Sequence, residues 1–323
     1  MKYIFLGSTK LSLIILEFLI KNSYIPSAIF YIPQNFKVRY FGKEVEMHNY
    51  NYADLYSFAE KNKIPSFEVD SGKGKRIEIY KHIIESMDLD LALVIGWYYL
   101  IPKSLLNIPR YGFWGLHASL LPKYAGGAPL VWAIINGEKE TGVTLFKMNE
   151  KVDAGDIIMQ RKIRICYNDT IKTLLKKVEK ISKEIILEAF KNIENIKFIP
   201  QNGIPIKYPQ RKPEDGRIDW NKASFEIYNF VRAQTLPYPC AFTFLNDQMI
   251  KIISIEEKNI ISSNYEPGTI VFFDGKPLVA TKDKFVEIKK IIVNGKITNF
   301  NSFINKLIEQ KQKNLPICFL KFL

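Results

Sequence analysis

Short apolar runs alternate with amphipathic stretches through roughly the first 150 residues of this 323-residue chain. The apolar runs predict buried strands at residues 2–6, 27–31, 91–95, 113–116 and 144–147. The amphipathic stretches predict helices after a Ser8-Thr9 cap, at 52–62, at 77–86, around 130–135 and at 170–192. Strands that alternate with helices favour βαβ units, so we expect an α/β fold with a mostly parallel sheet.

The rest of the chain has a different pattern. Residues 198–211 are interrupted by proline and glycine, which is typical of a boundary between domains. Beyond them, short apolar segments recur at nearly even spacing, at residues 241–245, 249–256, 268–273, 277–280 and 285–293. This spacing predicts a small antiparallel, OB-like β-barrel. We therefore expect two domains, residues 1–200 and residues 201–323.

The composition narrows the classes of binding partner but does not distinguish among them. The chain has 46 Lys and Arg against 33 Asp and Glu, and its formal net charge of +13 favours anionic partners. Nucleic acid, a nucleotide, polyphosphate and an acidic membrane surface all fit that charge. The longest apolar run, residues 11–20, is too short to span a bilayer, and the N-terminus lacks the small-residue cleavage site of a secretory signal. We expect no membrane partner.

The cysteines favour a reducing compartment, and the cysteines and histidines together predict no metal site in the protein. Cys166, Cys240 and Cys318 are odd in number and widely spaced, which fits the cytoplasm and no disulfide framework. Three scattered histidines and no C-x-x-C pair predict no zinc or other metal site. Gly7 follows the first predicted strand, but a dinucleotide-binding turn needs three glycines, so no such site is predicted there.

The residues most suggestive of chemistry lie between Gly112 and Gln160. His117 stands where a predicted strand gives way to a loop, which is where α/β proteins place reactive side chains. The following loop, residues 120–129, has adjacent glycines and two prolines, so its backbone can approach a ligand closely. Asp153 follows His117 by 36 residues. A carboxylate beside an imidazole raises the imidazole pKa and fixes its tautomer, so the two predict a proton-handling pair; ordinary loop roles are the alternative.

The whole segment strongly resembles the formyltransferase family that uses 10-formyltetrahydrofolate, through the pattern HxSLLPxYxGxxPxxWAIxxGExxTGVTLxxMxxxxDxGDI. The motif positions of that family correspond to His117, Ser119, Leu120, Leu121, Pro122 and Asp153. The resemblance extends more weakly over the whole chain. It implies a Rossmann-like formyltransferase domain followed by an OB-like domain, catalytic roles for His117 and Asp153, and 10-formyltetrahydrofolate as the formyl donor.

One catalytic position departs from the family pattern. The family has Asn two residues before the histidine, whereas this chain has Gly115. The family's amide is expected to hold the developing oxyanion, a contribution of roughly 3 kcal/mol by analogy with other oxyanion donors. Another group or a water substitutes for the amide, or the enzyme is slow, or it is inactive. We favour substitution because the rest of the motif is intact.

The family serves several amine acceptors, namely methionyl-tRNA, glycinamide ribonucleotide and 4-amino sugars on nucleoside diphosphates. Methionyl-tRNA enzymes carry a Gly-, Arg- and Lys-rich loop after their first two strands, but the corresponding residues 33–43 are basic and aromatic with one glycine. Lys123-Tyr124 and Trp132 are similar to the sugar-nucleotide enzymes. The resemblance therefore implies a nucleotide-linked 4-amino-4,6-dideoxy sugar, as used in O-antigen and lipopolysaccharide synthesis.

The resemblance also implies which residues bind the two substrates. The folate-binding residues would be Ile95, Trp97, Tyr98, Tyr99, Leu100, Ile101 and Asp153. The acceptor-binding residues would be Ser119, Lys123, Tyr124, Gly126, Gly127, Arg211 and Tyr238. Arg211 would reach a diphosphate and Tyr238 would stack on a base. A surface aromatic cluster and a solvated arginine are the ordinary alternatives.

These inferences lead to a cytoplasmic N-formyltransferase whose partners are folate and a nucleotide-linked amino sugar. Nucleic acid is the less favoured partner, and the sequence leaves a homodimer open. Two alternatives stand beside this interpretation. The net charge and the OB-like tail favour a methionyl-tRNA formyltransferase. Alternatively, Gly115 marks an inactive homologue whose barrel binds nucleic acid or a protein partner.

Overall fold

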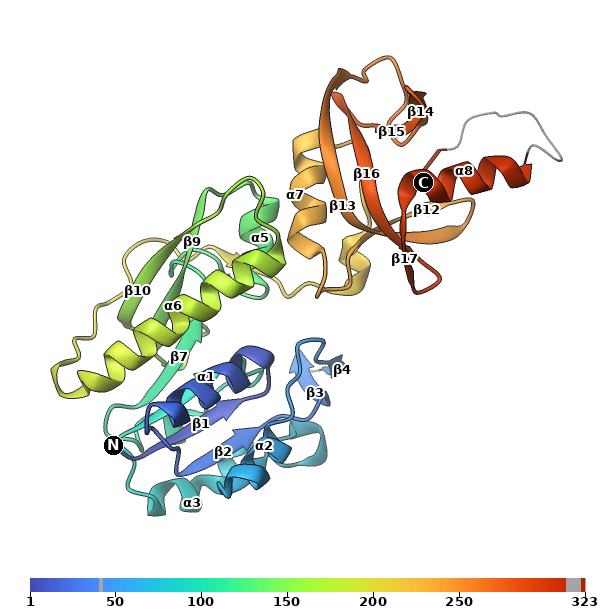
Figure 1. The fold of residues 1–323 in the computed structure, drawn as a ribbon. Helices are drawn as coiled ribbons and strands as arrows, with labels where there is room; N and C mark the ends of the chain where they lie inside the picture. Colours follow the sequence, from blue (N-terminus) through green and yellow to red (C-terminus); the bar gives the residue numbers. More distant parts are fainter. Residues whose placement is uncertain (41–42, 312–320, 323) are drawn as a thin grey trace. The chain divides into compact units, whose positions relative to one another are not determined.

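The computed structural model describes residues 1–40, 43–311 and 321–322, and the chain forms two compact units (Figure 1). The first unit contains residues 1–129, 141–164 and 176–208, and the second contains residues 130–140, 165–175 and 209 onward. Helix α5 (Pro129–Ile135) and the start of α6 (Ile171–Lys191) therefore belong largely with the C-terminal part. The single boundary after residue 200 stays a prediction. Cys318 and Gly42 lie outside the described residues.

A seven-stranded sheet in the order β10-β9-β7-β6-β1-β2-β5 forms the centre of the first unit. Its strands are β1 (Tyr3–Gly7), β2 (Ala28–Tyr31), β5 (Ser66–Glu68), β6 (Leu91–Ile95), β7 (Phe113–His117), β9 (Glu140–Lys147) and β10 (Ile157–Arg164). The strands from β7 to β5 are parallel, whereas β9 pairs antiparallel with β7. The predicted α/β fold with a mostly parallel sheet is confirmed.

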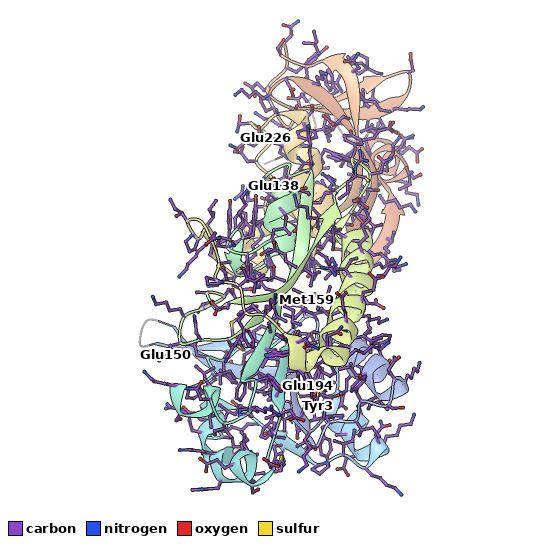
Figure 2. All side chains as sticks on the ribbon, turned by 90° about the vertical axis from the view of Figure 1, so that its left-hand side faces the viewer. Tyr3, Glu138, Glu150, Met159, Glu194 and Glu226 are labelled. Atoms are coloured by element: carbon purple, nitrogen blue, oxygen red, sulfur yellow. The ribbon has the colours of Figure 1, made fainter. Side chains whose placement is uncertain are left out.

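The central strands are apolar because they are buried on both faces, as parallel strands in α/β proteins are. Every residue of β1 and β6 is buried. Tyr3, labelled in Figure 2, is fully buried, and its hydroxyl donates to the Tyr24 carbonyl at 2.9 Å. Thr9 is the N-cap of helix α1 (Lys10–Lys21), and its side chain accepts from the Ser12 amide, so the cap predicted at Ser8-Thr9 lies at Thr9.

Several elements of the first unit differ from the sequence-based expectation. The helix predicted at 77–86 is a 3-10 turn, η2 (Ile77–Tyr80), followed by α3 (Lys81–Ser86). Of the residues compared above with a loop, those from 35 to 40 form β3 (Asn35–Tyr40), which makes an antiparallel hairpin with β4 (Lys43–His48) (Figure 1). Helices α2 (Leu55–Asn62) and α4 (Lys103–Leu106) complete the connections. Strand β8 (Ala125–Gly126) pairs in parallel with β11 (Lys207–Tyr208), far along the chain.

The second unit is built on an antiparallel sheet in the order β12-β13-β16-β15-β14, with β17 paired to β16. The strands are β12 (Ala241–Leu245), β13 (Gln248–Ile261), β14 (Ile270–Phe273), β15 (Lys276–Ala280), β16 (Lys284–Val293) and β17 (Lys296–Asn299). This confirms the predicted C-terminal β domain. Helices α7 (Ser224–Gln234) and α8 (Phe300–Lys311) were not predicted, although Ile227, Val231 and Phe300 belong to the unit's core. Within the described residues, no helix is long and apolar enough to cross a membrane.

Candidate active site

His117 is the last residue of β7 and is only 9% exposed. Its Nε2 lies 2.8 Å from the carbonyl oxygen of Tyr124. A carbonyl oxygen can only accept, so Nε2 carries the proton and the ring's other nitrogen, Nδ1, has the free lone pair in the neutral state. Nδ1 faces Asp153, with 3.7 Å between Nδ1 and Oδ2. The imidazole is therefore held in the tautomer whose basic nitrogen points at a carboxylate.

Asp153 is held in a tight turn after β9. Its Oδ2 accepts the Gly126 amide at 2.8 Å, and its backbone has a φ of 52°, in the left-handed region. A Cβ at Gly155 would lie 1.6 Å from the Lys147 carbonyl oxygen, so the turn requires glycine there. The Gln201 side-chain amide donates to the carbonyls of Asp153 and Gly155 at 2.8 and 2.7 Å. These contacts fix the carboxylate relative to His117.

The separation between His117 and Asp153 decides what the pair can do. At 3.7 Å, Nδ1 and Oδ2 are too far apart for a direct hydrogen bond, and in the neutral ring both atoms are acceptors. When Nδ1 takes a proton, the carboxylate lies close enough to stabilise the positive charge. Both side chains are largely buried, so solvent screens this attraction less than at the surface. The pair is suited to accept and release one proton.

The loop after His117 is held by its own hydrogen bonds and by β9 and β10. The Ser119 hydroxyl donates to the Lys123 carbonyl at 2.7 Å, and the Thr144 hydroxyl donates to the Ser119 carbonyl at 2.7 Å. The Gln160 amide donates to Thr144 Oγ1 and to the Leu121 carbonyl at 2.8 and 3.1 Å. Ser119 is fully buried, so its hydroxyl supports the loop in this structure.

Strand β11, which is distant along the chain, is held against this loop by Tyr124, Gly126 and Gly127. The rings of Tyr124 and Tyr208 are stacked, with centroids 4.8 Å apart and an angle of 6° between the planes. The Gly127 amide donates to the Tyr208 carbonyl at 2.9 Å. A Cβ at Gly126 would lie 2.5 Å from that same oxygen, and its φ is +93°, so the close approach depends on glycine.

The expected folate-binding segment follows β6, which is the neighbour of β7 in the sheet. The Trp97 ring nitrogen Nε1 is buried and has no hydrogen-bond partner among the described residues. The Tyr98 hydroxyl donates to Asn49 Oδ1 at 3.1 Å, and the Tyr99 hydroxyl donates to the Lys37 carbonyl at 3.0 Å. Ile95 and Ile101 are buried, whereas Leu100 is 65% exposed. Among the side chains of this segment, Trp97 thus presents a buried donor without a partner in the described part of the chain.

A cavity of about 570 Å³ adjoins the hairpin rather than His117. It is lined by Asn35, Phe36, Lys37, Glu46, Met47, His48, Asp70, Gly72 and Lys73. Phe36 packs against Tyr98 and Tyr99, so the hairpin side of this cavity is joined to the expected folate segment. Within the described residues, no group of three or more His, Cys, Asp or Glu is placed to hold a metal ion.

Arg211 and Tyr238 belong to the second unit, whereas His117 and Asp153 belong to the first. The Arg211 guanidinium lies over the rings of Trp132 and Phe230, 4.9 and 5.5 Å from their centroids, and donates to Gln234 Oε1 at 2.9 Å. Burial lowers the pKa of Arg211, against the opposing attraction of Asp215. Arg211 is therefore part of a packed aromatic cluster, which was not expected.

Sequence patterns missed three residues that hold the site, namely Gln160, Gln201 and Tyr208. Gln201 lies in the Pro- and Gly-interrupted stretch that was interpreted as a domain boundary. A single polar residue in such a stretch has no periodicity to mark it. Thr144 belongs to the TGVTL part of the family pattern, but nothing in the sequence shows that its hydroxyl bonds the Ser119 carbonyl.

Two family models match this chain: "Formyl transferase" over residues 51–190 and "Formyl transferase, C-terminal domain" over residues 211–307. It belongs to the formyltransferase family. The chain is 39% identical over 215 residues to a methionyl-tRNA formyltransferase from Thermodesulfovibrio yellowstonii, covering 66% of this chain and 68% of that protein. It is also 39% identical over 234 residues to the bifunctional polymyxin resistance protein ArnA of Wigglesworthia glossinidia brevipalpis, covering 71% of this chain and 34% of ArnA.

A solved N-formyltransferase from Helicobacter canadensis shares the fold of this formyltransferase. Its structure, in complex with folinic acid and dTDP-3-aminofucose, aligns with a TM-score of 0.62 at 21% identity. The alignment covers 89% of this chain and 98% of the other. The family assignment makes the chain an enzyme that transfers formyl groups.

Proposed function

We propose that this formyltransferase transfers a formyl group from 10-formyltetrahydrofolate to the amino group of a nucleotide-linked amino sugar. The choice of acceptor rests on the β3–β4 hairpin. This hairpin stands in the sequence where a tRNA enzyme would have a basic loop. Lys37 of β3 is the register partner of Glu46 of β4. This basic residue thus has an acidic residue directly across the hairpin.

This pairing makes the hairpin poorly suited to bind a nucleic-acid backbone. Binding to phosphates depends on cations whose charge is available to replace condensed counterions. Opposite charges across an antiparallel pair attract each other and stabilise the hairpin instead. The similarity of Lys123-Tyr124 and Trp132 to sugar-nucleotide enzymes supports the same acceptor, as does the dTDP-3-aminofucose bound by the Helicobacter protein.

The proposed chemistry requires one proton to be moved by His117. When bound, 10-formyltetrahydrofolate supplies the electrophilic formyl carbon. The attacking amine gives a proton to Nδ1 of His117, whose lone pair is directed by the hydrogen bond from Nε2 to the Tyr124 carbonyl. Asp153 stabilises the resulting imidazolium from 3.7 Å. His117 then gives this proton to the leaving nitrogen of the formyl donor as its bond to the formyl carbon breaks, so the ring ends in its starting state.

The residues that follow β6 fit a folate. The buried Trp97 Nε1 donor lacks a partner among the described residues, and a pterin carries nitrogen and oxygen acceptors. Tyr98 and Tyr99 add aromatic surface beside it. Ile95 and His117 end adjacent parallel strands, and ligands of α/β proteins bind at that edge of the sheet. On these grounds we assign the binding site of 10-formyltetrahydrofolate to this edge of the sheet.

The test is a formyl-transfer assay with TDP-, UDP- and GDP-linked amino sugars in one arm and methionyl-charged initiator tRNA in the other. We expect turnover of an amino sugar and none of the tRNA. His117→Ala should lower kcat by about 10²–10⁴-fold, the usual range for a general acid–base group. His82→Ala is the matched control, because the His82 side chain is 95% exposed on α3. Near-normal turnover by His117→Ala would remove the mechanism.

Methionyl-tRNA is the second candidate acceptor. The net charge of +13 and the 39% identity to the Thermodesulfovibrio enzyme favour it. Formylation of the charged tRNA without activity on any amino sugar would establish this candidate in place of the first. The assignment of His117 and Asp153 to proton transfer would stand in either case, because both reactions formylate a primary amine.

A further inference from the structure

Phe146 lies directly across from Gly115, the position where the family pattern has Asn. The two residues are register partners in the antiparallel pair of β7 and β9. Register partners place their side chains on the same face of a sheet. A Cβ on Gly115 would lie 2.7 and 2.8 Å from Cζ and Cε1 of Phe146, and 3.2 Å from Cγ of Met148. The tip of the Phe146 ring therefore covers the glycine.

The Phe146 ring also supports the loop that holds His117. Phe146 is 3% exposed and forms a small cluster with Leu121 and Ala125, on which Met148 packs. Leu121 and Ala125 stand on either side of Tyr124, whose carbonyl accepts from His117 Nε2. Thr144, two residues before Phe146 on β9, is the register partner of His117 and bonds the same loop at Ser119.

We propose that Phe146 is a positioning residue for His117 and the reason why residue 115 is glycine. The ring fills the volume that a side chain at 115 would need, and from that place it holds the loop carrying the Tyr124 carbonyl. Residues 115 and 146 therefore form one exchangeable pair, in which a large ring at 146 requires glycine at 115. This inference rests on the proposed role of His117.

The pair leads to a definite expectation for restoring the family's amide. Gly115→Asn alone would force the ring out of a close-packed cluster, which interiors of this density resist. Phe146→Leu shortens the side chain at the point of contact and opens room at residue 115. An Asn at 115 should therefore be accepted only when residue 146 is smaller.

The experiment is a double-mutant cycle with Gly115→Asn, Phe146→Leu and the combined variant. Thermal unfolding is measured first, because it needs no substrate and is unaffected if the acceptor has been wrongly assigned. We expect the unfolding midpoint to fall in each single variant and to fall less in the combined variant than the sum of the two losses. Additive losses, or a Gly115→Asn protein as stable as the parent, would overturn the pairing.

The positioning role is tested by kcat and its dependence on pH, with whichever acceptor proves active. Phe146→Leu should lower kcat by about tenfold and shift its pH profile, because a loosened Tyr124 carbonyl no longer fixes the His117 tautomer. Phe285→Leu, at a fully buried site in the second unit, is the matched control and should lose stability without a change in the pH profile. An unshifted profile with unchanged kcat in Phe146→Leu would overturn the positioning role. If Gly115→Asn proves unstable at assay temperature, Gly115→Ala replaces it in the cycle, with the same expected coupling.

Discussion

The carboxyl ends of β7 and β6 are neighbours at one edge of the same sheet, yet they differ in whether their buried polar groups have hydrogen-bond partners. At the end of β7, the chain pairs its own polar groups: His117 with Tyr124, Asp153 with Gly126, and the turn carbonyls with Gln201. At the end of β6, the chain leaves the buried Nε1 of Trp97 without a partner among the described residues. The first end is held by its own hydrogen bonds, whereas the second has a buried side-chain donor without a partner in the part of the chain that the structure describes.

Asp153→Asn tests the end of β7 and is expected to have the largest effect. An amide in place of the carboxylate cannot stabilise a protonated His117, so kcat should fall by about a hundredfold, within the range of general acid–base effects. Thermal unfolding should change little, since Asn can still accept from the Gly126 amide. Steady-state kinetics measure the loss. Asp88→Asn, whose side chain is 95% exposed, serves as control, and equal kinetics in the two variants would contradict the role.

Trp97→Phe tests the β6 end with a smaller expected effect. The change removes the Nε1 donor and keeps an aromatic ring, so affinity for folinic acid should fall by about tenfold, the value of one hydrogen bond lost to a bound ligand. The ligand-free protein should not lose stability through that donor, because the donor has no partner to lose. Titration calorimetry and thermal unfolding measure the two quantities.

Trp132→Phe provides the contrast for this variant. Trp132 Nε1 donates to the Pro209 carbonyl at 3.0 Å, so its loss should lower the stability of the free protein and leave the affinity for folinic acid unchanged. Suppose instead that Trp97→Phe lowers the stability of the free protein as much as Trp132→Phe does and binds folinic acid normally. The Nε1 donor of Trp97 then does not bind the ligand.

Gln201→Leu is expected to have the smallest effect of the three. It removes two hydrogen bonds to the turn of Asp153, which should lower the free energy of unfolding by about 1 kcal/mol and kcat by a few-fold. Denaturant unfolding and kinetics measure both. Asn202→Leu, at the exposed neighbouring position, is the control. A Gln201→Leu protein with unchanged kcat would show that the turn holds Asp153 without this amide.

The regular elements of the first unit could be predicted because their signals are local. Burial on both faces makes strands such as β6 continuous apolar runs, and the helix period marks α6. The hairpin of β3 and β4 was missed although apolar and polar residues alternate in both strands, because residues 33–43 were compared only with the loop of tRNA enzymes. Helix α7 was missed although apolar residues such as Ile227, Phe230 and Val231 recur along it, because only the evenly spaced strands after residue 240 were used to predict the second domain.

The amino-acid sequence alone was enough to predict an α/β domain followed by an antiparallel β domain, and its motif singled out His117 and Asp153. Both depend on residue types at fixed spacing, which one chain displays directly. The groups that contact His117 and Asp153 became visible in the folded chain alone. The Tyr124 carbonyl, the Gln201 amide and the Phe146 ring reach the site through strand pairing and turns, and pairing brings together residues whose separation along the chain carries no periodic signal. Gly115 shows this most clearly, because its environment is set by a residue 31 positions away, on the neighbouring strand.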